Sequence, residues 1–415
     1  MPINIVQLIK QAQEDCQSVF SALEEVELYN TTRVLDAMQT HQVAARHFAP
    51  TTGYGYGDIG RDTLEAIFAD VFGTEAAIVR PHIASGTHAL SLCLFGLLLP
   101  GDHLLSASGK PYDTLDGVIG IAGDEPGSLK EMNVSYSHVE LGGDGGLDLE
   151  AIKQAMRPNT KVVMVQRSRG YAWRNSLTPE DIYPLANMLH SEYPGVILMV
   201  DNCYGEFVRK TEPSHHGADV VVGSLIKNPG GGLAPTGGYI AGNEKCIRRI
   251  ASRLTAPGVG QEVGSYAGSY QPFYQGLFIA PHIVMQALKT AILAARSFEL
   301  LGMKTTPSAF AERSDIIQAI QMQSPDRLIA FCQGIQAASP VDSMAKPEPW
   351  DMPGYQNQVI MAAGTFVSGA SIELSADAPM REPFIAYLQG GLTFSHGRIA
   401  LHKALTHMQK SGCLK

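Results

Sequence analysis

The sequence predicts an α/β protein whose main sheet is largely parallel and is covered by helices on both faces. The runs at residues 161–168, 195–202 and 218–227 are continuously apolar and close with polar residues, a pattern typical of strands that are buried on both faces. Residues 177–195 separate two of these runs and have the length of a helical crossover between parallel strands. With 415 residues, the chain exceeds the size at which a single core usually stops growing, so two domains are expected.

The elements before these strands complete the large domain. A short strand is predicted over 75–81, and apolar residues at helical spacing predict a helix over 89–101. Thr178, followed by Pro179, is predicted to cap the crossover helix. An amphipathic helix precedes the first strand, with apolar residues at Leu64, Ile67, Phe68, Val71 and Phe72.

The chain divides into three predicted segments. An N-terminal helical segment covers 1–54, a large α/β domain covers 55–285, and a small α+β domain covers 286–415. One long helix, over 280–302, is expected to lead out of the large domain. The small domain is predicted from helix-like and strand-like runs over 326–341, 357–366 and 383–391.

Charge, hydropathy and cysteine spacing exclude several classes of protein. A formal net charge of -9 argues against a general nucleic-acid binder. No run approaches the ~18 apolar residues of a membrane span, and the N-terminus lacks a signal-peptide core. The six cysteines include no C-x-x-C pair, which predicts reduced thiols in a cytoplasmic protein rather than disulfides or a metal site. We therefore expect a small-molecule ligand.

Ligands of open parallel sheets bind at the carboxyl ends of the strands, so the polar residues there are the candidate site. Ser85, Gly86 and Thr87 follow the strand at 75–81 and open the next helix. Their N–H and hydroxyl groups would converge where the helix dipole favours an anion such as a phosphate. An ordinary helix cap is the alternative interpretation.

Two charged residues close later strands of the same sheet. Asp201 follows an apolar run, where a poorly solvated carboxylate requires a cationic partner; capping of the next turn is the alternative. Lys227 precedes a glycine-rich loop, where burial would disfavour its charged form and make the amine available for a Schiff base; a lysine that extends to solvent is the alternative. Together, the anion site, the acid and the lysine match the phosphate, pyridine nitrogen and aldehyde of pyridoxal 5'-phosphate.

The motifs around these residues resemble those of a known family. "SGTHAL", "VDNCYGEF" and "GSLIKNPGG" are similar to motifs of fold-type-I pyridoxal-phosphate enzymes of the cysteine/methionine metabolism group. "QRSRGYAWRNSLT", "YQGLFIAPH" and "REPFIAYLQGGLT" resemble, more narrowly, the bacterial aluminium-resistance or methionine-gamma-lyase-like family. The resemblance spans nearly the whole chain. It implies a mainly parallel, seven-stranded type of sheet and makes 55–285 the cofactor-binding domain.

The resemblance also implies roles for individual residues. Lys227 would form the Schiff base and act in catalysis, and Asp201 would pair with the pyridinium nitrogen. Tyr112 would stack on the cofactor ring and contribute to catalysis, unless it is a turn aromatic that covers the core. The phosphate would be held by Ser85, Gly86, Thr87 and Ser224.

Substrate binding and assembly follow from the same resemblance. A substrate carboxylate requires an arginine, for which Arg381 is the first candidate and Arg169 the second. Tyr54 and Tyr56 are candidates to reach the cofactor of a neighbouring subunit, although their spacing departs from that of true gamma-lyases. The segment 254–278 reads as a loop too apolar to lie free in solvent, so we expect a homodimer or homotetramer with shared active sites. A loop folded over its own domain is the alternative.

The function implied by the resemblance is that of a carbon–sulfur lyase. Such an enzyme, methionine gamma-lyase-like or cystathionine beta-lyase-like, would use pyridoxal phosphate to eliminate a thiol from a sulfur amino acid. One alternative is another enzyme of the same fold, such as an aminotransferase or an aldolase. A second alternative is a non-catalytic stress-response protein that retains the fold.

Overall fold

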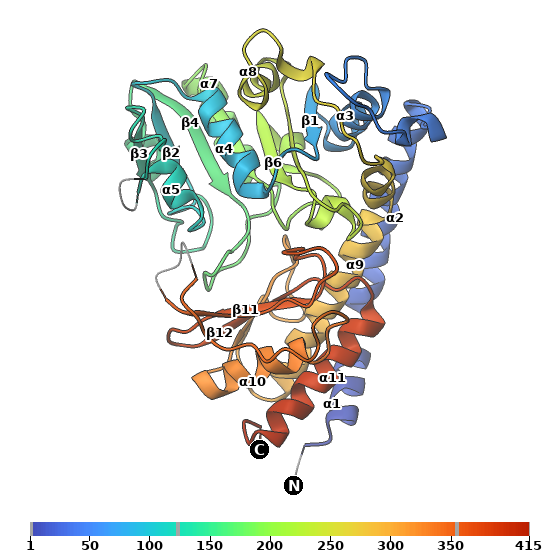
Figure 1. Cartoon of the computed structure of the whole chain (residues 1–415). Helices are drawn as coiled ribbons and strands as arrows, with labels where there is room; N and C mark the ends of the chain where they lie inside the picture. Colours follow the sequence, from blue (N-terminus) through green and yellow to red (C-terminus); the bar gives the residue numbers. More distant parts are fainter. Residues whose placement is uncertain (1–2, 122–124, 353–356, 415) are drawn as a thin grey trace.

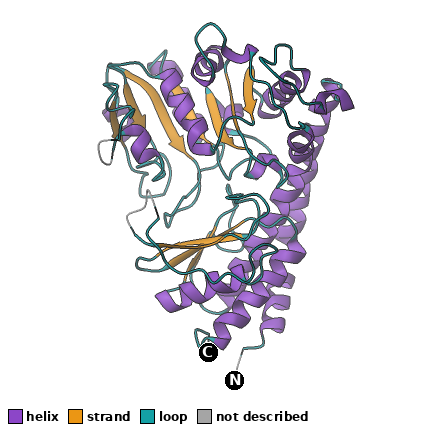
Figure 2. Ribbon diagram, viewed as in Figure 1, coloured by secondary structure: helices purple, strands orange, loops and turns teal. Residues whose placement is uncertain are grey.

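The computed structural model describes residues 3–121, 125–352 and 357–414 of the chain. A seven-stranded sheet with its covering helices lies above a five-stranded sheet in the view of Figure 1, and helix α9 (Gln271–Leu300) runs alongside both. Figure 2 shows helices around the large sheet, helices below the small sheet and loops between the two sheets. The arrangement confirms the predicted α/β class with a smaller C-terminal α+β part.

The seven-stranded sheet has the strand order β1-β7-β6-β5-β4-β2-β3. The pairs from β6 through β5, β4 and β2 to β3 are parallel, whereas β7 is antiparallel to both of its neighbours. Two antiparallel pairings in succession return β1 to the direction of β6, so the loops after β1, β5 and β6 open at the same edge. The strands are β1 (Ala76–Arg80), β2 (His103–Ser106), β3 (Ser135–His138), β4 (Thr160–Gln166), β5 (Ile197–Asp201), β6 (Val220–Ser224) and β7 (Gly238–Gly242).

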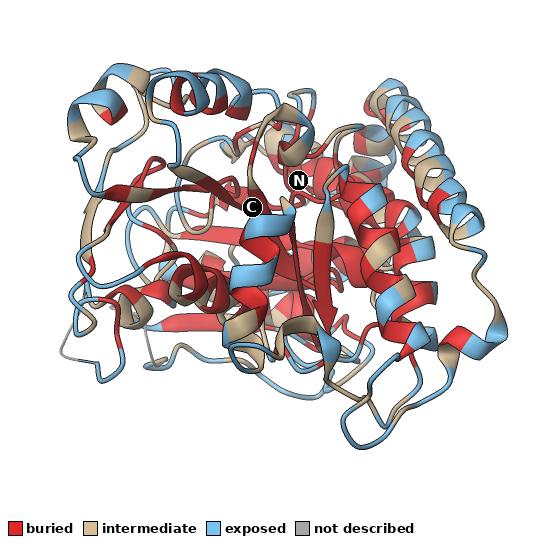
Figure 3. Ribbon diagram, turned by 90° about the horizontal axis from the view of Figure 1, so that it is seen from above, coloured by how far each residue is buried: buried red, intermediate tan, exposed pale blue. Residues whose placement is uncertain are grey.

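Successive residues of the central strands enter two different cores. In β4, Val162 and Met164 join one cluster, and Val163 and Val165 join the other. This two-sided burial explains why the strands are continuously apolar, and Figure 3 shows buried residues throughout the strands. The first face is covered by α4 (Gly86–Leu97), α5 (Leu115–Ile119) and α8 (Glu244–Leu254), and the second by α3 (Ile59–Phe72), α6 (Leu149–Ala155), α7 (Ile182–Glu192) and α9.

The crossover helix α7 begins later than the sequence predicts. Its first residue is Ile182, and the expected cap, Thr178, lies in the turn before it. The Asp181 N–H donates to Thr178 Oγ1 at 3.1 Å, and the Thr178 N–H donates to Asp181 Oδ2 at 2.7 Å. The predicted start was wrong because this reciprocal pair closes a separate turn before α-helical geometry is reached.

Helix α9 belongs to the core of both parts of the molecule. It contributes Leu277 and Val284 to the cluster under the large sheet, and Leu293 and Phe298 to the cluster under the small one. The predicted domain boundary after residue 285 therefore falls inside a continuous helix. Contrary to the sequence expectation, α9 is long and apolar enough to cross a membrane by length and composition, but 67% of its most apolar stretch is buried inside the protein. It is the core helix on which α1 (Ile5–Asp15) and α2 (Gln17–Thr40) pack.

The segment 254–278 is a loop only as far as Tyr270, because Gln271 begins α9. Within it lies the 3-10 turn η4 (Gly260–Glu262). The Arg80 guanidinium donates to the carbonyls of Gln261 and Val263, each at 2.9 Å, and the Gly264 N–H donates to the Tyr54 carbonyl at 2.9 Å. This part of the loop folds over its own domain, which was the alternative interpretation.

The five-stranded sheet is antiparallel and has the order β10-β11-β12-β9-β8. One face packs on α1, α9, α10 (Pro325–Gln336) and α11 (Phe394–Lys410). The other face carries Ile317 and Tyr387, which pack with Tyr171 and Tyr204 of the large domain. The strands are β8 (Thr305–Thr306), β9 (Gln318–Gln321), β10 (Val359–Ala362), β11 (Ser375–Pro379) and β12 (Ile385–Gln389).

Candidate active site

One cavity lies between the carboxyl edge of the large sheet and the open face of the small sheet. We call it the Lys227 cavity. The small sheet contributes Asp377, Tyr387 and Gln389 to its walls. The structure brings together in this cavity the predicted residues Ser85, Gly86, Thr87, Tyr112, Asp201, Ser224 and Lys227.

The start of α4 is compatible with both interpretations of the Ser85–Thr87 segment, a helix cap and an anion site. Ser85 is the N-cap, and its Oγ accepts a hydrogen bond from the His88 N–H at 3.1 Å. A Cβ placed on Gly86 would lie 3.4 Å from Cys203 Sγ and 3.5 Å from the Ser224 Cβ. The glycine therefore brings the helix start, with its unpaired N–H groups, close to the ends of β5 and β6.

Asp201 is the last residue of β5 and is buried. Its Oδ1 accepts a hydrogen bond from the Cys203 N–H at 3.1 Å. Burial raises the pKa of the Asp201 carboxyl, although the Lys227 cation acts in the opposite direction. A carboxylate in this position gains stability from a further cationic partner.

Lys227 lies just after β6, and its Nζ is 4.0 Å from the centroid of the Tyr204 ring. Burial alone would lower the pKa of this amine, but the acidic groups of Cys203, Tyr204, Asp201 and Glu206 outweigh burial and raise the pKa above its usual value. The acidic groups around Lys227 therefore oppose the effect of burial on which the sequence expectation rests.

The glycines after Lys227 allow the loop to pack directly on α9. Gly231 has a φ of 55°, and a Cβ there would lie 2.4 Å from the Gly276 carbonyl oxygen. A Cβ on Gly276 would in turn lie 2.3 Å from the Gly230 carbonyl oxygen. Two backbones meet here with no side chain between them, and this contact fixes the chain that leaves Lys227.

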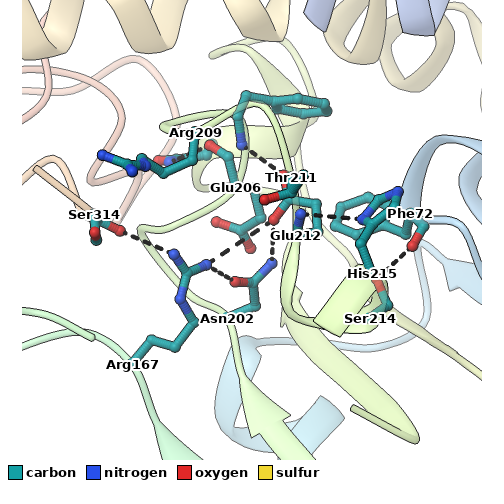
Figure 4. A network of polar contacts seen from close by, with 12 residues as sticks. Phe72, Arg167, Asn202, Glu206, Arg209, Thr211, Glu212, Ser214, His215 and Ser314 are labelled. Carbon is teal, nitrogen blue, oxygen red and sulfur yellow. Dashed lines mark hydrogen bonds and ion pairs between the residues drawn. The ribbon is translucent and has the colours of Figure 1, made fainter. Parts of the chain in front are cut away.

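A buried polar network supports the residues next to Asp201 and Lys227 (Figure 4). The Asn202 side chain accepts a hydrogen bond from Arg167 and donates to Glu212 Oε2 at 3.0 Å. Asn228 Nδ2 donates to the Glu206 carbonyl at 2.9 Å. Burial raises the pKa of the Glu206 carboxyl to about 8. The network thus anchors the chain immediately after both charged site residues.

Tyr112 lines the cavity beside Tyr171, with ring centroids 6.0 Å apart. Its backbone N–H donates to Gln166 Oε1 at 2.8 Å, which attaches the loop after β2 to the end of β4. The side chain is partly buried. The position suits an aromatic ring that covers a flat ligand.

The remaining predicted residues do not line the Lys227 cavity. Arg381 is exposed in the turn between β11 and β12. Arg169 is buried in the fold, where Nη1 donates to the Thr306 carbonyl at 2.5 Å and Nε lies 3.9 Å from Asp315 Oδ2. Tyr54 and Tyr56 are 74% and 67% exposed. Their assigned roles stay predictions.

The sequence did not reveal four further residues of the cavity. Tyr204 follows Asp201 in the next turn, with a φ of 72°, and Tyr387 and Gln389 lie on β12. Asp377 is an acidic residue within the buried strand β11. A carboxylate inside a buried strand is the one signal that could have drawn attention to this group, because buried charges are rarely tolerated without a role.

The fold is that of fold-type-I pyridoxal-phosphate enzymes. The structure of the pyridoxal-5'-phosphate-dependent protein YhfS from Escherichia coli superposes with a TM-score of 0.60 and covers 98% of each chain at 18% identity. The family model for methionine gamma-lyase matches residues 5–409. The chain belongs to the methionine gamma-lyase family.

Two relatives are much more similar in sequence. The protein YnbB of Bacillus subtilis is 50% identical over 401 residues, covering 96% of this chain and 95% of YnbB. The structure of a carbon–sulfur lyase involved in aluminum resistance from Clostridium novyi is 50% identical, with a TM-score of 0.94, and covers 97% of this chain and 96% of that one.

We predict that Gly231→Ala destabilises the protein by about 3–5 kcal/mol, because left-handed strain adds to the clash with Gly276. Gly302 has a φ of 76° and no atom within 4 Å of the point that a Cβ would occupy, so Gly302→Ala is a matched control that should cost about 1 kcal/mol. Urea unfolding measures both free energies. Equal losses would show that the loop does not depend on its contact with α9.

Proposed function

We propose that the protein is a pyridoxal-phosphate-dependent carbon–sulfur lyase that eliminates a thiol from a sulfur amino acid. The observation that carries the proposal is the convergence of the α4 start, Asp201 and Lys227 in one cavity. These groups come from three separate strand ends of the large sheet. Membership of the methionine gamma-lyase family and similarity to the carbon–sulfur lyase from Clostridium novyi support the choice of reaction.

The donor groups of the cavity fit the cofactor. The N–H groups at the start of α4 and the hydroxyls of Ser85, Thr87 and Ser224 suit a phosphate dianion. Burial raises the pKa of the Asp201 carboxyl and the Lys227 cation only opposes this effect; a protonated pyridine nitrogen would stabilise the carboxylate further. Lys227 offers the only lysine amine among the described lining residues of this cavity to an aldehyde. Gly86 leaves open the space that a side chain would occupy between α4, Cys203 and Ser224.

When bound, pyridoxal phosphate supplies an electron sink for bonds at the substrate Cα. Asp201 would hold a proton on the ring nitrogen, and Lys227 would take the proton from the substrate Cα. Lys227 must be uncharged for that step. Pairing of Asp201 with a cation removes one of the acidic influences that now raise the Lys227 pKa, so ligand binding favours the reactive form of the amine.

Arg169 is the better placed of the two candidates for the substrate carboxylate. Its Nε and Nη2 are buried and make no hydrogen bond among the described residues, although Nε lies 3.9 Å from Asp315 Oδ2, and guanidinium N–H groups that lack a hydrogen bond suit a carboxylate. Both Arg169 and the Lys227 cavity adjoin Gln166. Arg381 is exposed and would have to move to reach the cavity.

We also propose a dimer or tetramer in which Tyr54 and Tyr56 extend the partner's site. Their rings lie 5.7 Å apart and are largely exposed. Ile59, the first residue of α3, and Phe278, in the second turn of α9, are 47% and 42% exposed. Exposed large apolar side chains of this kind are typical of an interface when they lie together.

The alternatives to a lyase differ in their products. An aminotransferase transfers the amino group to a keto acid, and an aldolase cleaves a carbon–carbon bond. A non-catalytic stress-response protein turns over no amino acid. The buried network behind Asp201 and Lys227 favours an enzyme, because it positions charged groups at a cost in stability.

We predict that the purified protein is yellow and that borohydride fixes the cofactor to Lys227. Peptide mapping by mass spectrometry locates the adduct, and protein that has not been reduced should release a thiol with pyruvate or 2-oxobutyrate. An adduct on Lys110, Lys161 or Lys210 would disprove the lysine assignment. Amino transfer to a keto acid without thiol would identify an aminotransferase instead.

Asp201→Asn should retain the cofactor but lower turnover by about 100-fold or more, because a neutral amide does not hold the ring nitrogen protonated. Asp144, in an exposed turn, provides the control Asp144→Asn, which should leave turnover unchanged. Absorbance reports cofactor content and a thiol reagent reports turnover. Wild-type rates for Asp201→Asn would assign the ring nitrogen to another acid.

Mixing two inactive chains tests the shared site. Lys227→Ala lacks the reactive amine, and Tyr56→Ala lacks the side chain proposed to act across the interface. After joint refolding, mixed dimers should recover part of the activity at sites that combine an intact Lys227 with an intact Tyr56 from the partner. No recovery, together with a fully active monomer in sedimentation, would restrict each site to one chain.

A further inference from the structure

Asp377 is a second buried acid in the Lys227 cavity, and it comes from the small sheet. It lies on β11 and is 9% exposed. Its Oδ2 accepts a hydrogen bond from Gln389 Nε2 at 3.0 Å, whereas its Oδ1 is buried and has no hydrogen-bond partner among the described residues. Because both residues line the cavity, this oxygen is available to a ligand there.

The groups that face Asp377 do not neutralise it. Tyr204, on the loop after β5, and the Cys332 thiol, on α10, are close enough for Asp377 to raise the pKa of each. Lys227, Asp201 and Tyr387 line the same cavity. No ion pair to Asp377 is found within the described part of the chain. Burial raises the pKa of the Asp377 carboxyl to about 7, opposed only by the hydrogen bond from Gln389.

This environment differs from that of Asp201. Asp201 accepts a backbone N–H and experiences the Lys227 cation, and both favour its ionised form. Asp377 has one amide donor and no cation that lowers its pKa. Two carboxyl groups in one cavity whose surroundings differ in this way are suited to opposite tasks, one as a fixed negative charge and the other as a proton donor.

We propose that Asp377 is the general acid that protonates the departing sulfur as the carbon–sulfur bond breaks. The inference rests on the proposed lyase function and deepens it. In the step, the carbon–sulfur electron pair leaves with sulfur, while the pair from the cleaved C–H bond supplies the new carbon–carbon double bond. The proton on the Asp377 carboxyl moves to sulfur, which yields a neutral thiol and the carboxylate. Solvent water then restores the proton.

The chemistry of the leaving group explains why an acid is needed. An alkanethiolate is a fairly strong base, at least as basic as the thiolate of cysteine, whose thiol has a pKa of about 8.5, so expelling the sulfur as a neutral thiol lowers the barrier. A general acid works best when its pKa lies near the working pH. An aryl thiolate is a weaker base and departs without help.

The experiment compares two leaving groups in the cofactor-loaded enzyme. S-ethyl and S-(4-nitrophenyl) derivatives of cysteine or homocysteine, whichever the wild type cleaves, are assayed with Asp377→Asn. We expect kcat/KM for the S-ethyl substrate to fall about 100-fold and that for the nitrophenyl substrate to change less than about 3-fold. Ser375→Ala is the matched control, since Ser375 lies on the same strand, is buried and does not line the cavity.

The pH profile gives a second readout that a structural role would not move. With the S-ethyl substrate, wild-type kcat/KM should decline as pH rises through about 7, because Asp377 loses its proton there. Asp377→Asn should lack this decline. Gln389→Met removes the hydrogen bond that favours the carboxylate, so it should shift the decline to higher pH. The second variant keeps Asp377 itself in place if the asparagine variant folds poorly.

The outcomes separate the two proposals. Absence of thiol release from either substrate by the wild type would overturn the lyase function and this inference together. Thiol release with equal losses on both substrates would overturn only the role of Asp377.

Discussion

The contact between the glycine loop and α9 is the constraint on which the rest of the site depends. Gly230 and Gly231 meet Gly276 backbone to backbone, with no room for a Cβ on either side. The same loop begins at Lys227, and the same helix continues into the core of the small sheet. The contact between the glycine loop and α9 therefore constrains both the direction in which the chain leaves Lys227 and the position of the small sheet, which carries Asp377.

The electrostatics of the cavity follow from this arrangement. Asp201, Glu206 and Asp377 are buried carboxyl groups whose pKa values are raised by burial, and Arg169 has guanidinium nitrogens without acceptors among the described residues. Folding alone leaves these groups incompletely paired, at a cost in stability. Of these groups, Asp201 and Asp377 line the cavity, so a ligand that brings a cation to them would stabilise the folded chain.

The site residues of the large domain can be predicted from the sequence because the ends of parallel strands follow a simple rule. Ser85, Asp201 and Lys227 each follow a strand, and strands that run the same way end at the same edge. Tyr112 is predicted as a site residue only from the resemblance to a family, since no pattern in the neighbouring sequence indicates a role for it. Asp377 escapes such reasoning because its position depends on how an antiparallel sheet, formed far along the chain, faces the first sheet.

Local details are less predictable for a related reason. The pKa of Lys227 depends on four acidic neighbours as well as on burial, and those neighbours lie at the end of β5 and in the loop after it. The start of α7 depends on two reciprocal hydrogen bonds between Thr178 and Asp181. A capping rule considers Thr178 alone and therefore places the first turn of the helix too early. The segment 254–278 reads as one loop because the apolar residues that begin α9 follow its glycines without a break in composition.

The packing of α1 has a consequence for the order in which the molecule is completed. This helix precedes the large domain in sequence, yet it packs on α9 and α11, and Gln409 Nε2 donates to the Ile3 carbonyl at 3.0 Å. During synthesis α1 emerges long before α9 and α11, so it cannot take its final place until both of these later helices have been made. The N-terminal helix is therefore completed together with the small domain, although the large domain separates the two in sequence.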